Sequence, residues 1–330
     1  MSAVRTIERP SWLASLQRRM ADTPAIPLTF VFVAIFVVTD IVNRVQVGHA
    51  FLTPSNVSTT FLYAAILGLI AAGQTLVMLT GGVDLSVAAT ATTAGFIASG
   101  LGHHGAPYAI LVAVGVATAI GVVNGIGVAV FHANPLIMTL GVSSVTLGGL
   151  AIYGQRALAP LVPNFVRTLG SGRFFTYIPY DLAVWAPIAA LIVLGLRYSG
   201  LGRMIYAVGD NPISCRLAGV RVWQVLLIVY TLCGMLSGIA GVLLDGFANG
   251  ADLSLAAPFL LPSVAAVVIG GTSIFGGIGG YSGTILGALI LTVLQSLLTI
   301  LNASEWTREV LYGAIILALA ALYARTQTRE

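Results

Sequence analysis

Residues 71–89 read AAGQTLVMLTGGVDLSVAA, an apolar run that breaks at Gly81 and Gly82 and resumes after Asp84. A second apolar run ends in a similar way, because a glycine-rich stretch over residues 270–280 separates it from the next one. Such breaks free backbone N–H and C=O groups, which at membrane depth are tolerated only where protein buries them or where they line a water-filled cavity. Discontinuous helices often build the substrate paths of transporters. The two breaks therefore predict helices that are interrupted inside a membrane protein.

The composition of the whole chain supports this class. Apolar residues make up 58% of the 330 residues, charged residues make up only 8%, and the mean hydropathy is +0.98. Soluble domains have about 45–50% apolar and about 25% charged residues. The apolar runs are continuous rather than alternating, which excludes a transmembrane β-barrel. We therefore expect an all-α, polytopic membrane protein.

A helix needs about 20 mostly apolar residues to cross a bilayer. The apolar runs predict ten such spans, at about 26–43, 57–79, 84–101, 107–131, 136–153, 181–199, 223–245, 258–275, 281–301 and 308–324. An even number of spans places both termini on one side of the membrane. Ten of the fifteen arginines fall on that side, so the positive-inside rule predicts that both termini are cytoplasmic.

The chain is expected to divide into three parts. Residues 1–25 form a basic leader, which includes a short amphipathic helix over residues 12–20. Residues 26–325 form one transmembrane domain, and residues 326–330 form a cytoplasmic tail. Within the domain, residues 57–153 and 223–324 are hypothesised to be two related halves, because each contains a glycine-rich break between apolar runs.

The basic residues exclude one kind of nucleotide site. All fifteen are arginine, whereas a P-loop requires a lysine that reaches the phosphates. If ATP drives this protein, a partner hydrolyses it. The four histidines do not combine with cysteines or carboxylates at ligand spacing, so we expect no metal, no cofactor and no catalytic residue. Cys215 lies in a polar segment and Cys233 in an apolar run, so a disulfide between them is not expected.

Residues 202–220 read GRMIYAVGDNPISCRLAGV and form a polar segment between long apolar stretches. Asn211 before Pro212 predicts the N-cap and the first residue of a short helix, and Gly219 predicts its end. Residues 207–211 are expected to contain a turn. A short capped helix joined to two spans can act as a lever for a partner, but composition alone does not exclude an ordinary solvated loop. The residues that would carry such coupling are Arg203, Gly209, Asp210, Asn211, Arg216 and Gly219.

Four polar residues near or within apolar stretches are candidates for a translocation pathway: Gln74, Asp84, Asn124 and Asn134. A carboxylate at membrane depth costs about 2.5–3.5 kcal/mol on insertion scales, so Asp84 needs a function or a partner. We expect it mainly to be the N-cap of a helix that begins at Leu85, a role that can coexist with a place in the pathway. Asn124 is expected to bond across helices, and Asn134 before Pro135 to mark a turn.

Four blocks of the sequence, taken in order, resemble the permease subunits of bacterial ribose-type (monosaccharide) ABC importers, which are related to the branched-chain amino acid permeases. They are residues 71–89 (quoted above), 124–141 (NGIGVAVFHANPLIMTLG), 202–220 (quoted above) and 263–280 (SVAAVVIGGTSIFGGIGG). The resemblance extends over about residues 57–324. Three positions depart from the family's usual pattern, and they weaken any assignment of one particular sugar: Ala88 and Ala89, Asp210, and the stretch 259–262.

The resemblance implies a multi-pass permease of the bacterial inner membrane and three protein partners. These are a cytoplasmic ABC ATPase subunit, a periplasmic sugar-binding protein, and a second permease subunit that is either an identical chain or a close paralogue. In that arrangement the polar segment looks like the coupling segment that docks on the ATPase. Nucleic acid is not implied as a partner.

The function expected first is the import of a monosaccharide or a related polyol. An amino acid is the alternative substrate within the same class, and an ion-coupled secondary transporter is the alternative from another class. Ion coupling is expected to need membrane-embedded carboxylates, whereas Asp40, Asp84 and Asp245 fall near predicted span ends. Asp245 and Asp252 are expected to bracket an outer loop. A purely structural membrane scaffold would not explain the pattern of the polar segment.

Overall fold

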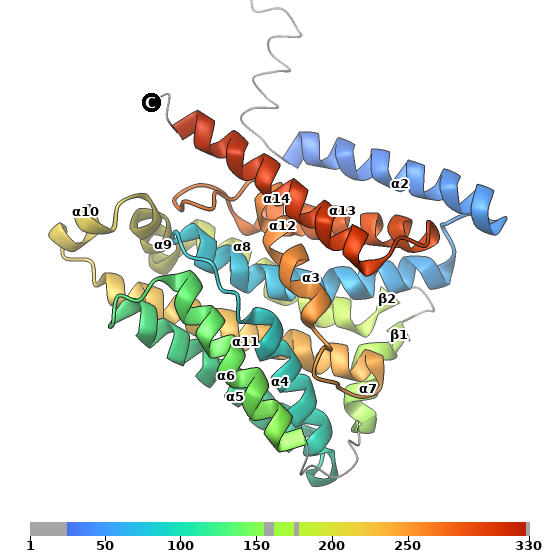
Figure 1. Cartoon of the computed structure of the whole chain (residues 1–330), viewed down its shortest axis with the longest axis horizontal. Helices are drawn as coiled ribbons and strands as arrows, with labels where there is room; N and C mark the ends of the chain where they lie inside the picture. The colour runs from blue at the N-terminus through green and yellow to red at the C-terminus, as the bar shows by residue number, and fades with distance from the viewer. Residues whose placement is uncertain (1–24, 155–161, 175–177, 328–330) are drawn as a thin grey trace, which may run out of the picture.

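The computed structural model describes residues 25–154, 162–174 and 178–327 (Figure 1). These residues are almost entirely helical, which confirms the expected all-α membrane fold. The β structure among the described residues is a small antiparallel pair of two-residue strands, β1 (Arg173–Phe174) and β2 (Ile178–Pro179), and loops that include the two glycine-rich breaks connect the helices. The leader over residues 1–24, with its expected amphipathic helix, and residues 328–330 of the tail lie outside the described residues.

Each predicted span overlaps a helix. These helices are α2 (Ala25–Val47), α3 (Pro54–Leu79), α4 (Val87–Gly100), α5 (Ala106–Ala129), α6 (Pro135–Gly154), α8 (Tyr180–Tyr198), α11 (Val222–Ala248), α12 (Leu260–Ile269), α13 (Tyr281–Ile300) and α14 (Glu305–Gln327). The connections contain η1 (Gly102–His104), α7 (Asn164–Ser171), α9 (Gly200–Asp210), α10 (Pro212–Leu217) and η2 (Ala257–Phe259).

The count of ten membrane spans is not confirmed. Within the described residues, seven helices are long and apolar enough to cross a membrane, namely α2, α3, α5, α6, α8, α11 and α13. The glycine-rich breaks shorten α4 to 14 residues and α12 to 10 residues. At 1.5 Å per residue these helices reach only about 21 Å and about 15 Å, less than the hydrocarbon core. The broken helices inferred from the glycines are thus present, and they lower the number of full spans.

The two proposed halves do not repeat each other in a simple way. In the first half the long helix α3 precedes the break and the short helix α4 follows it. In the second half the short helix α12 comes first and the long helix α13 follows. The internal repeat therefore stays a hypothesis.

Helix α3 is the centre of the core. Every residue from Ala64 to Leu79 is buried, and α3 contacts α8, α11, α12 and α13. Its sequence has no polar face over this stretch, as expected of a helix that is surrounded by others. The outer helices instead expose large apolar side chains, such as Phe30 on α2, Leu111 on α5 and Val145 on α6. In a membrane protein an apolar outer surface of this kind is suited to contact with lipid or with a neighbouring subunit.

Small residues let α5 and α11 pack backbone to backbone. A Cβ atom on Gly121 would fall on the carbonyl oxygen of Tyr230, and one on Gly234 would lie 2.5 Å from the carbonyl oxygen of Ala117. Close approach at small residues is a common way in which transmembrane helices associate. The glycine spacing in the sequence therefore had a packing role here.

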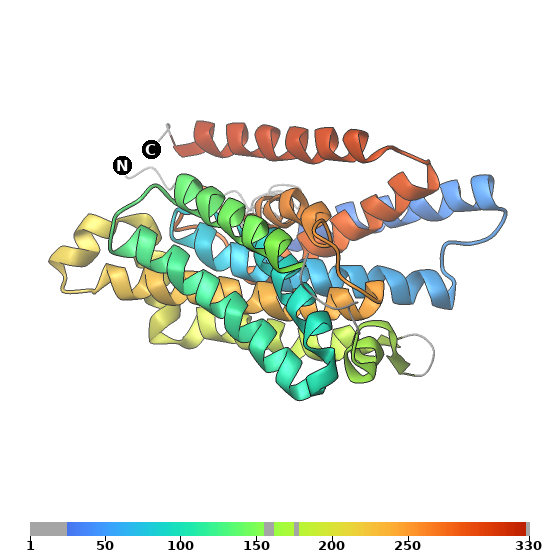
Figure 2. The same ribbon diagram turned by 60° about the horizontal axis from the view of Figure 1, so that its bottom comes forward.

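The molecule has two distinct ends. Helix α10 and the C-terminal end of α14 lie at one end, at the left of Figures 1 and 2. The connections from α2 to α3 and from α13 to α14 lie at the opposite end. Helix α3 runs between these ends, and its 26 residues correspond to a length of about 39 Å.

Candidate functional site

The two glycine-rich breaks meet at the end of α3. Gly277 donates its backbone N–H to the carbonyl oxygen of Leu79, the last residue of α3, at 3.0 Å. Gly81, Gly276 and Gly277 have φ values of +81°, +95° and +73°, which side chains other than glycine rarely adopt. The last carbonyl groups of a helix have no hydrogen-bond donor within the helix, and lipid offers none. The second break therefore supplies a donor, the N–H of Gly277, for the last carbonyl group of α3.

Helix α9, which belongs to the polar segment, packs against both breaks. A Cβ atom on Gly209 would fall on the carbonyl oxygen of Leu79 and would lie 2.6 Å from the amide nitrogen of Gly277. A Cβ atom on Gly276 would lie 2.8 Å from the carbonyl oxygen of Gly209 and 2.9 Å from the amide nitrogen of Gly81. Three backbone segments that are far apart in the sequence therefore touch at one point.

A side chain strengthens this junction. The hydroxyl group of Tyr206 on α9 donates a hydrogen bond to the carbonyl oxygen of Gly279 at 2.9 Å. Partial burial raises the pKa of Tyr206, so the hydroxyl keeps its proton throughout the neutral range. Ser199 caps α9 by accepting the N–H of Gly202 at 2.9 Å, while Arg203 is exposed. Helix α9 thus has one face against the breaks and another toward solvent.

The turn predicted over residues 207–211 is wrong. Gly209 and Asp210 form the last turn of α9, and the non-helical backbone begins only at Asn211. Gly209 does not serve a left-handed turn; it leaves room for the backbone of α3. Sequence alone could not separate these two uses of a glycine, because the neighbouring backbone comes from residues 79 and 277.

The short helix predicted after this point is confirmed. Asn211 accepts the N–H groups of Ile213 and Ser214 at 3.0 and 2.9 Å, and Pro212 is the first residue of α10. Gly219 follows the end of the helix with a φ of +82°. These local signals depend only on residues within one helical turn, so the sequence could predict them.

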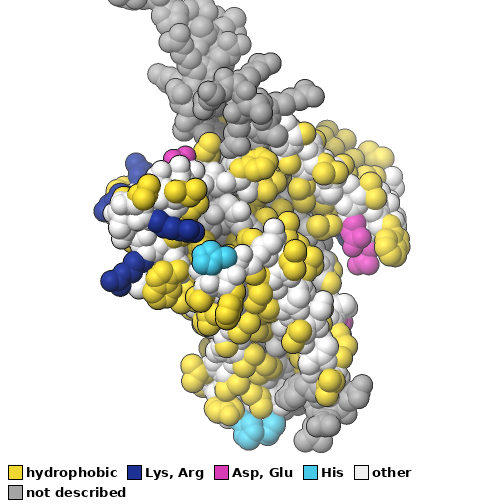
Figure 3. Space-filling model, turned by 60° about the vertical axis from the view of Figure 1, so that its left-hand side comes forward, with side chains coloured by type: hydrophobic (Ala, Val, Ile, Leu, Met, Phe, Trp, Pro, Cys, Tyr) yellow, Lys and Arg dark blue, Asp and Glu magenta, His cyan; other side chains and the backbone are white. Residues whose placement is uncertain are grey.

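Helix α10 presents both apolar and basic groups to solvent. Ile213 and Leu217 have exposed fractions of 67% and 86%, and Arg216 beside them is also exposed. In Figure 3, which brings this end forward, arginine side chains lie among hydrophobic atoms. A surface hollow of about 860 Å³ lies next to α10 and is lined in part by His132 and Arg216. Exposed apolar side chains with arginine nearby are typical of a surface that docks on another protein.

A buried polar cluster joins the first break to α5. Oδ1 of Asp84 accepts hydrogen bonds from the N–H and the hydroxyl group of Ser86, at 2.8 and 2.6 Å. The side-chain amide of Asn124 on α5 donates to the Ser86 hydroxyl oxygen at 2.7 Å. All three residues are buried. The structure therefore brings together two of the four pathway candidates, Asp84 and Asn124, and Asn124 bonds across helices as expected.

The interpretation of Asp84 as an N-cap is wrong. Helix α4 begins at Val87, and Ser86 occupies the N-cap position without a side-chain capping bond. Asp84 instead closes a turn with the residue two positions later, a common use of aspartate in loops. The break thus continues two residues farther than the sequence suggested.

The other two pathway candidates lie apart from this cluster. Gln74 on α3 is fully buried, and neither atom of its amide group has a hydrogen-bond partner within the described residues. Asn134 is exposed, and its Oδ1 accepts the N–H of Leu136 at 3.0 Å, in the turn expected before α6. Asn134 therefore has a local structural role outside the cluster.

Two buried polar contacts were not anticipated. The hydroxyl group of Ser99 on α4 donates to both carboxylate oxygens of Asp245 at 2.6 and 2.8 Å, and Asp245 lies in the last turn of α11, just before the loop that it was expected to border. Trp185 donates its indole N–H to the Tyr281 hydroxyl at 2.7 Å, and that hydroxyl donates to the carbonyl oxygen of Gly68 at 2.8 Å. The position of Asp245 at the end of an apolar run indicated that it needs a polar partner. The sequence could not show that this partner is Ser99, which lies on another helix.

Both cysteines are free and buried, in agreement with the expected absence of a disulfide between them. Cys215 lies on α10 and Cys233 on α11, where it packs against Gly73 of α3. In this position Cys233 fills space between two core helices.

Comparison with known proteins agrees with these features. The family described as branched-chain amino acid transport system / permease component matches residues 56–320. The chain is 32% identical to a ribose import permease protein of Bacillus subtilis, over 88% of this chain and 91% of the relative. It is also 32% identical to a fructose import permease protein of Rhizobium meliloti (93% of this chain, 88% of the relative) and to an L-arabinose ABC transporter permease protein of Azospirillum brasilense (84% and 83%). No solved structure is significantly similar. The chain is thus a multi-pass membrane protein that belongs to the branched-chain amino acid transport system / permease component family.

Proposed function

We propose that this chain is the membrane-spanning subunit of an ATP-driven importer that carries a monosaccharide or a related polyol into the cell. The similar proteins named above are import permeases for ribose, fructose and L-arabinose, and the similarity covers most of each chain. We therefore propose a monosaccharide or a related polyol as the substrate class of this chain, and we assign no particular sugar.

The observation that carries the mechanism is the contact of Gly209 with both glycine-rich breaks. Helix α9 continues through Asn211 into α10, whose exposed Ile213, Arg216 and Leu217 form the docking surface for an ATPase subunit. When ATP closes the ATPase, the docked helix α10 moves and α9 moves with it. Because α9 touches the break after α3 and the break before α13, one displacement shifts both interrupted helices. This shift opens the path to one side of the membrane and closes it to the other.

The proposed partners follow from the similarity to import permeases. A separate ATPase subunit is needed because this chain has no lysine and therefore no P-loop. A periplasmic binding protein delivers the sugar, and a second permease subunit completes the path. The chain lies in the bacterial inner membrane with both termini in the cytoplasm, which places the polar segment on the ATPase side.

An ion-coupled carrier is the competing function, and one observation bears on it. Asp84, Asp181 and Asp245 are all buried, and neither carboxylate oxygen of Asp181 has a hydrogen-bond partner within the described part of the chain. Buried carboxylates in membrane proteins can be proton or ion sites. Asp84 and Asp245, however, are each bonded to a serine, as structural carboxylates are.

The test is to search the neighbouring genes for an ATPase subunit and a binding protein, to purify the chain with these candidates, and to reconstitute the complex in liposomes. ATP hydrolysis and uptake are then measured with the binding protein loaded with ribose, fructose or L-arabinose. We expect one loaded binding protein to stimulate hydrolysis and to support ATP-dependent uptake. Uptake driven by a proton or sodium gradient in liposomes without ATP would instead support the ion-coupled carrier. An intact complex that no loaded binding protein stimulates would contradict the proposal.

A further inference from the structure

We infer that a polar cavity at the end of the molecule opposite the polar segment is a binding site for the hydroxyl groups of a sugar or polyol that enters the permease. This inference rests on the proposed function. The cavity has a volume of about 430 Å³, and it lies between α2, α3, α13 and α14. That volume is within the range of about 300–1,000 Å³ typical of small-molecule sites.

Two polar stripes form its main walls. On α3 the stripe consists of Asn56, Thr59, Thr60 and Tyr63, and on α13 it consists of Thr292, Gln295, Ser296 and Thr299. Residues three and four positions apart lie on the same face of a helix. The remaining residues of both helices are largely apolar. Two polar stripes that face one cavity are not expected of helices whose surroundings are lipid, because unpaired polar groups are costly there.

Part of the wall offers hydrogen-bond acceptors. The hydroxyl groups of Thr60, Thr292, Ser296 and Thr299 each donate to the carbonyl group four residues earlier, at 2.7, 2.8, 3.1 and 2.8 Å. Their protons are therefore used, while oxygen lone pairs remain available. These groups can accept hydrogen bonds from a sugar.

Other groups in the wall are not committed to the protein. The Thr59 hydroxyl, the Tyr63 hydroxyl and the Gln295 amide have no hydrogen-bond partner among the described residues. Arg308 donates through Nε to the carbonyl oxygen of Ala303 at 3.3 Å and adds further N–H groups to the cavity. A sugar hydroxyl both donates and accepts, so a wall that mixes donors with acceptors suits it.

The charge of the wall disfavours a cationic ligand. Arg308 is the one charged residue among the described residues that line the cavity, and no carboxylate lines it. An ammonium group bound here would therefore lack an anionic partner within this cavity.

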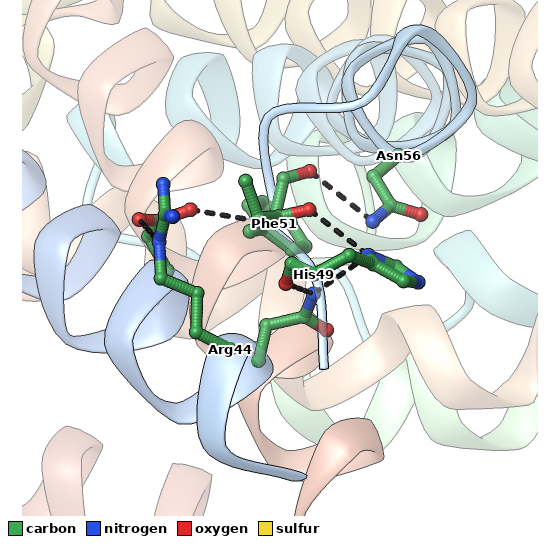
Figure 4. A network of polar contacts seen from close by, with 7 residues as sticks. Arg44, His49, Phe51 and Asn56 are labelled. Atoms are coloured by element: carbon green, nitrogen blue, oxygen red, sulfur yellow. Dashed lines mark hydrogen bonds and ion pairs between the residues drawn. The ribbon is translucent and has the colours of Figure 1, made fainter. Parts of the chain in front are cut away.

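The rim of the cavity is held in place by a local network (Figure 4). Asn43 donates to the carbonyl oxygen of His49 at 2.8 Å, and Asn56 donates to the carbonyl oxygen of Phe51 at 3.1 Å. The N–H of Phe51 donates to Asp40 at 2.7 Å, and Arg44 pairs with the same carboxylate at 2.7 Å. A rim fixed in this way loses little freedom when a ligand binds.

A second cavity lies beside the first. It has a volume of about 220 Å³, it shares Gln295 and Arg308 with the first cavity, and Glu305 and Glu309 of α14 line it. Gln295 therefore stands in the wall between the two spaces. This position makes Gln295 the most informative residue to change.

The test uses the reconstituted complex of permease, ATPase and binding protein, with the monosaccharide that stimulates the unaltered complex most. The variants are Gln295→Leu and Thr59→Val, and the matched control is Gln46→Leu, an exposed glutamine on α2 outside the cavity. Thr59→Val removes a hydroxyl that has no partner among the described residues, so it serves if Gln295→Leu fails to fold. We expect each cavity variant to lower uptake per ATP hydrolysed by about tenfold, with the control unchanged.

A second measurement tests access. Thr59→Cys should react with a membrane-impermeant thiol reagent added on the binding-protein side, and the sugar should slow this reaction. Folded cavity variants with normal uptake, or an introduced thiol that reacts only from the ATPase side, would overturn the inference. A failure of the proposed function itself would be distinct, since the unaltered complex would then show no ATP-dependent uptake.

Discussion

The backbone N–H of Gly277 donates to the carbonyl oxygen of Leu79 at 3.0 Å, so the second glycine-rich break closes the end of the helix that leads into the first. Gly209 packs against both atoms of this bond. The helix that leads to the proposed ATPase-docking surface is therefore in direct backbone contact with both interrupted helices.

Gly209→Ala is expected to abolish ATP-driven uptake. The new methyl group would overlap the carbonyl oxygen of Leu79, so α9 must move away from the breaks. Overpacking of this kind costs about 1–3 kcal/mol. Uptake and thermal unfolding should be measured together. Gly200→Ala is the matched control on the same helix, because its Cβ atom would meet only an arginine side chain at 3.9 Å. Equal uptake by both variants would contradict the role of this contact.

Tyr206→Phe is expected to weaken coupling without unfolding the protein. It removes the hydrogen bond to the carbonyl oxygen of Gly279, which is worth about 0.5–1.5 kcal/mol. Uptake per ATP hydrolysed should fall, while the thermal midpoint should change little. Tyr198→Phe is the control, because Tyr198 is exposed and its hydroxyl makes no hydrogen bond among the described residues. If the two variants behave alike, the Tyr206 bond has no part in coupling.

Asp84→Asn is expected to keep the fold, and Asp84→Ala to lose stability. Asn retains an oxygen that can accept both bonds from Ser86, whereas Ala leaves buried donors unpaired at a cost of about 1–3 kcal/mol. The chain offers a matched control in Asp252, whose Oδ1 accepts from the N–H and hydroxyl of Ser254 at 2.7 Å each but on the surface. Asp252→Ala should therefore cost less in thermal unfolding. A stable Asp84→Asn variant without uptake would show that the charge itself is needed.

Asn211→Ala is expected to destabilise α10 by about 1 kcal/mol, because two N–H groups lose their acceptor. A frayed α10 should reduce both ATPase binding and uptake. Asn211→Asp should restore them, since aspartate caps helices about as well as asparagine. Co-purification of the ATPase with each variant measures this: Asn211→Asp should retain the ATPase, and Asn211→Ala should lose it. Full activity of Asn211→Ala would mean that the cap is unimportant for docking.

Leu217→Ala is expected to weaken binding of the ATPase subunit by about tenfold without affecting the fold. Leu217 is 86% exposed, so its side chain contributes little to the stability of this chain, whereas docking of the ATPase would bury it. Leu111→Ala, at an exposed position on α5 far along the sequence, is the control. The measurement is the dissociation constant of the ATPase–permease pair in detergent, compared between Leu217→Ala, Leu111→Ala and the unaltered chain. Unchanged binding would place the docking surface elsewhere.

The sequence predicted those features that depend on neighbouring residues. The helical class follows from continuous apolar runs, since lipid requires backbone groups to be paired within a segment. The positions of the breaks follow from the glycines, and the ends of α10 follow from Asn211 and Gly219. Local signals were not always sufficient. Asp84 was expected to cap the helix, whereas it closes a turn that precedes the start of α4.

Only the tertiary structure decided which of these features meet. The Gly209 junction joins residues 79, 209 and 277, and the polar cavity joins stripes that lie more than two hundred positions apart on α3 and α13. Such contacts arise from the packing of whole helices, and the sequence of each helix carries no sign of its neighbour. The sequence by itself therefore determined the membrane class, the breaks and the short capped helix. Packing decided that α9, the helix that leads into the short capped helix, touches both breaks, because backbones approach this closely only where glycines of distant segments coincide in space.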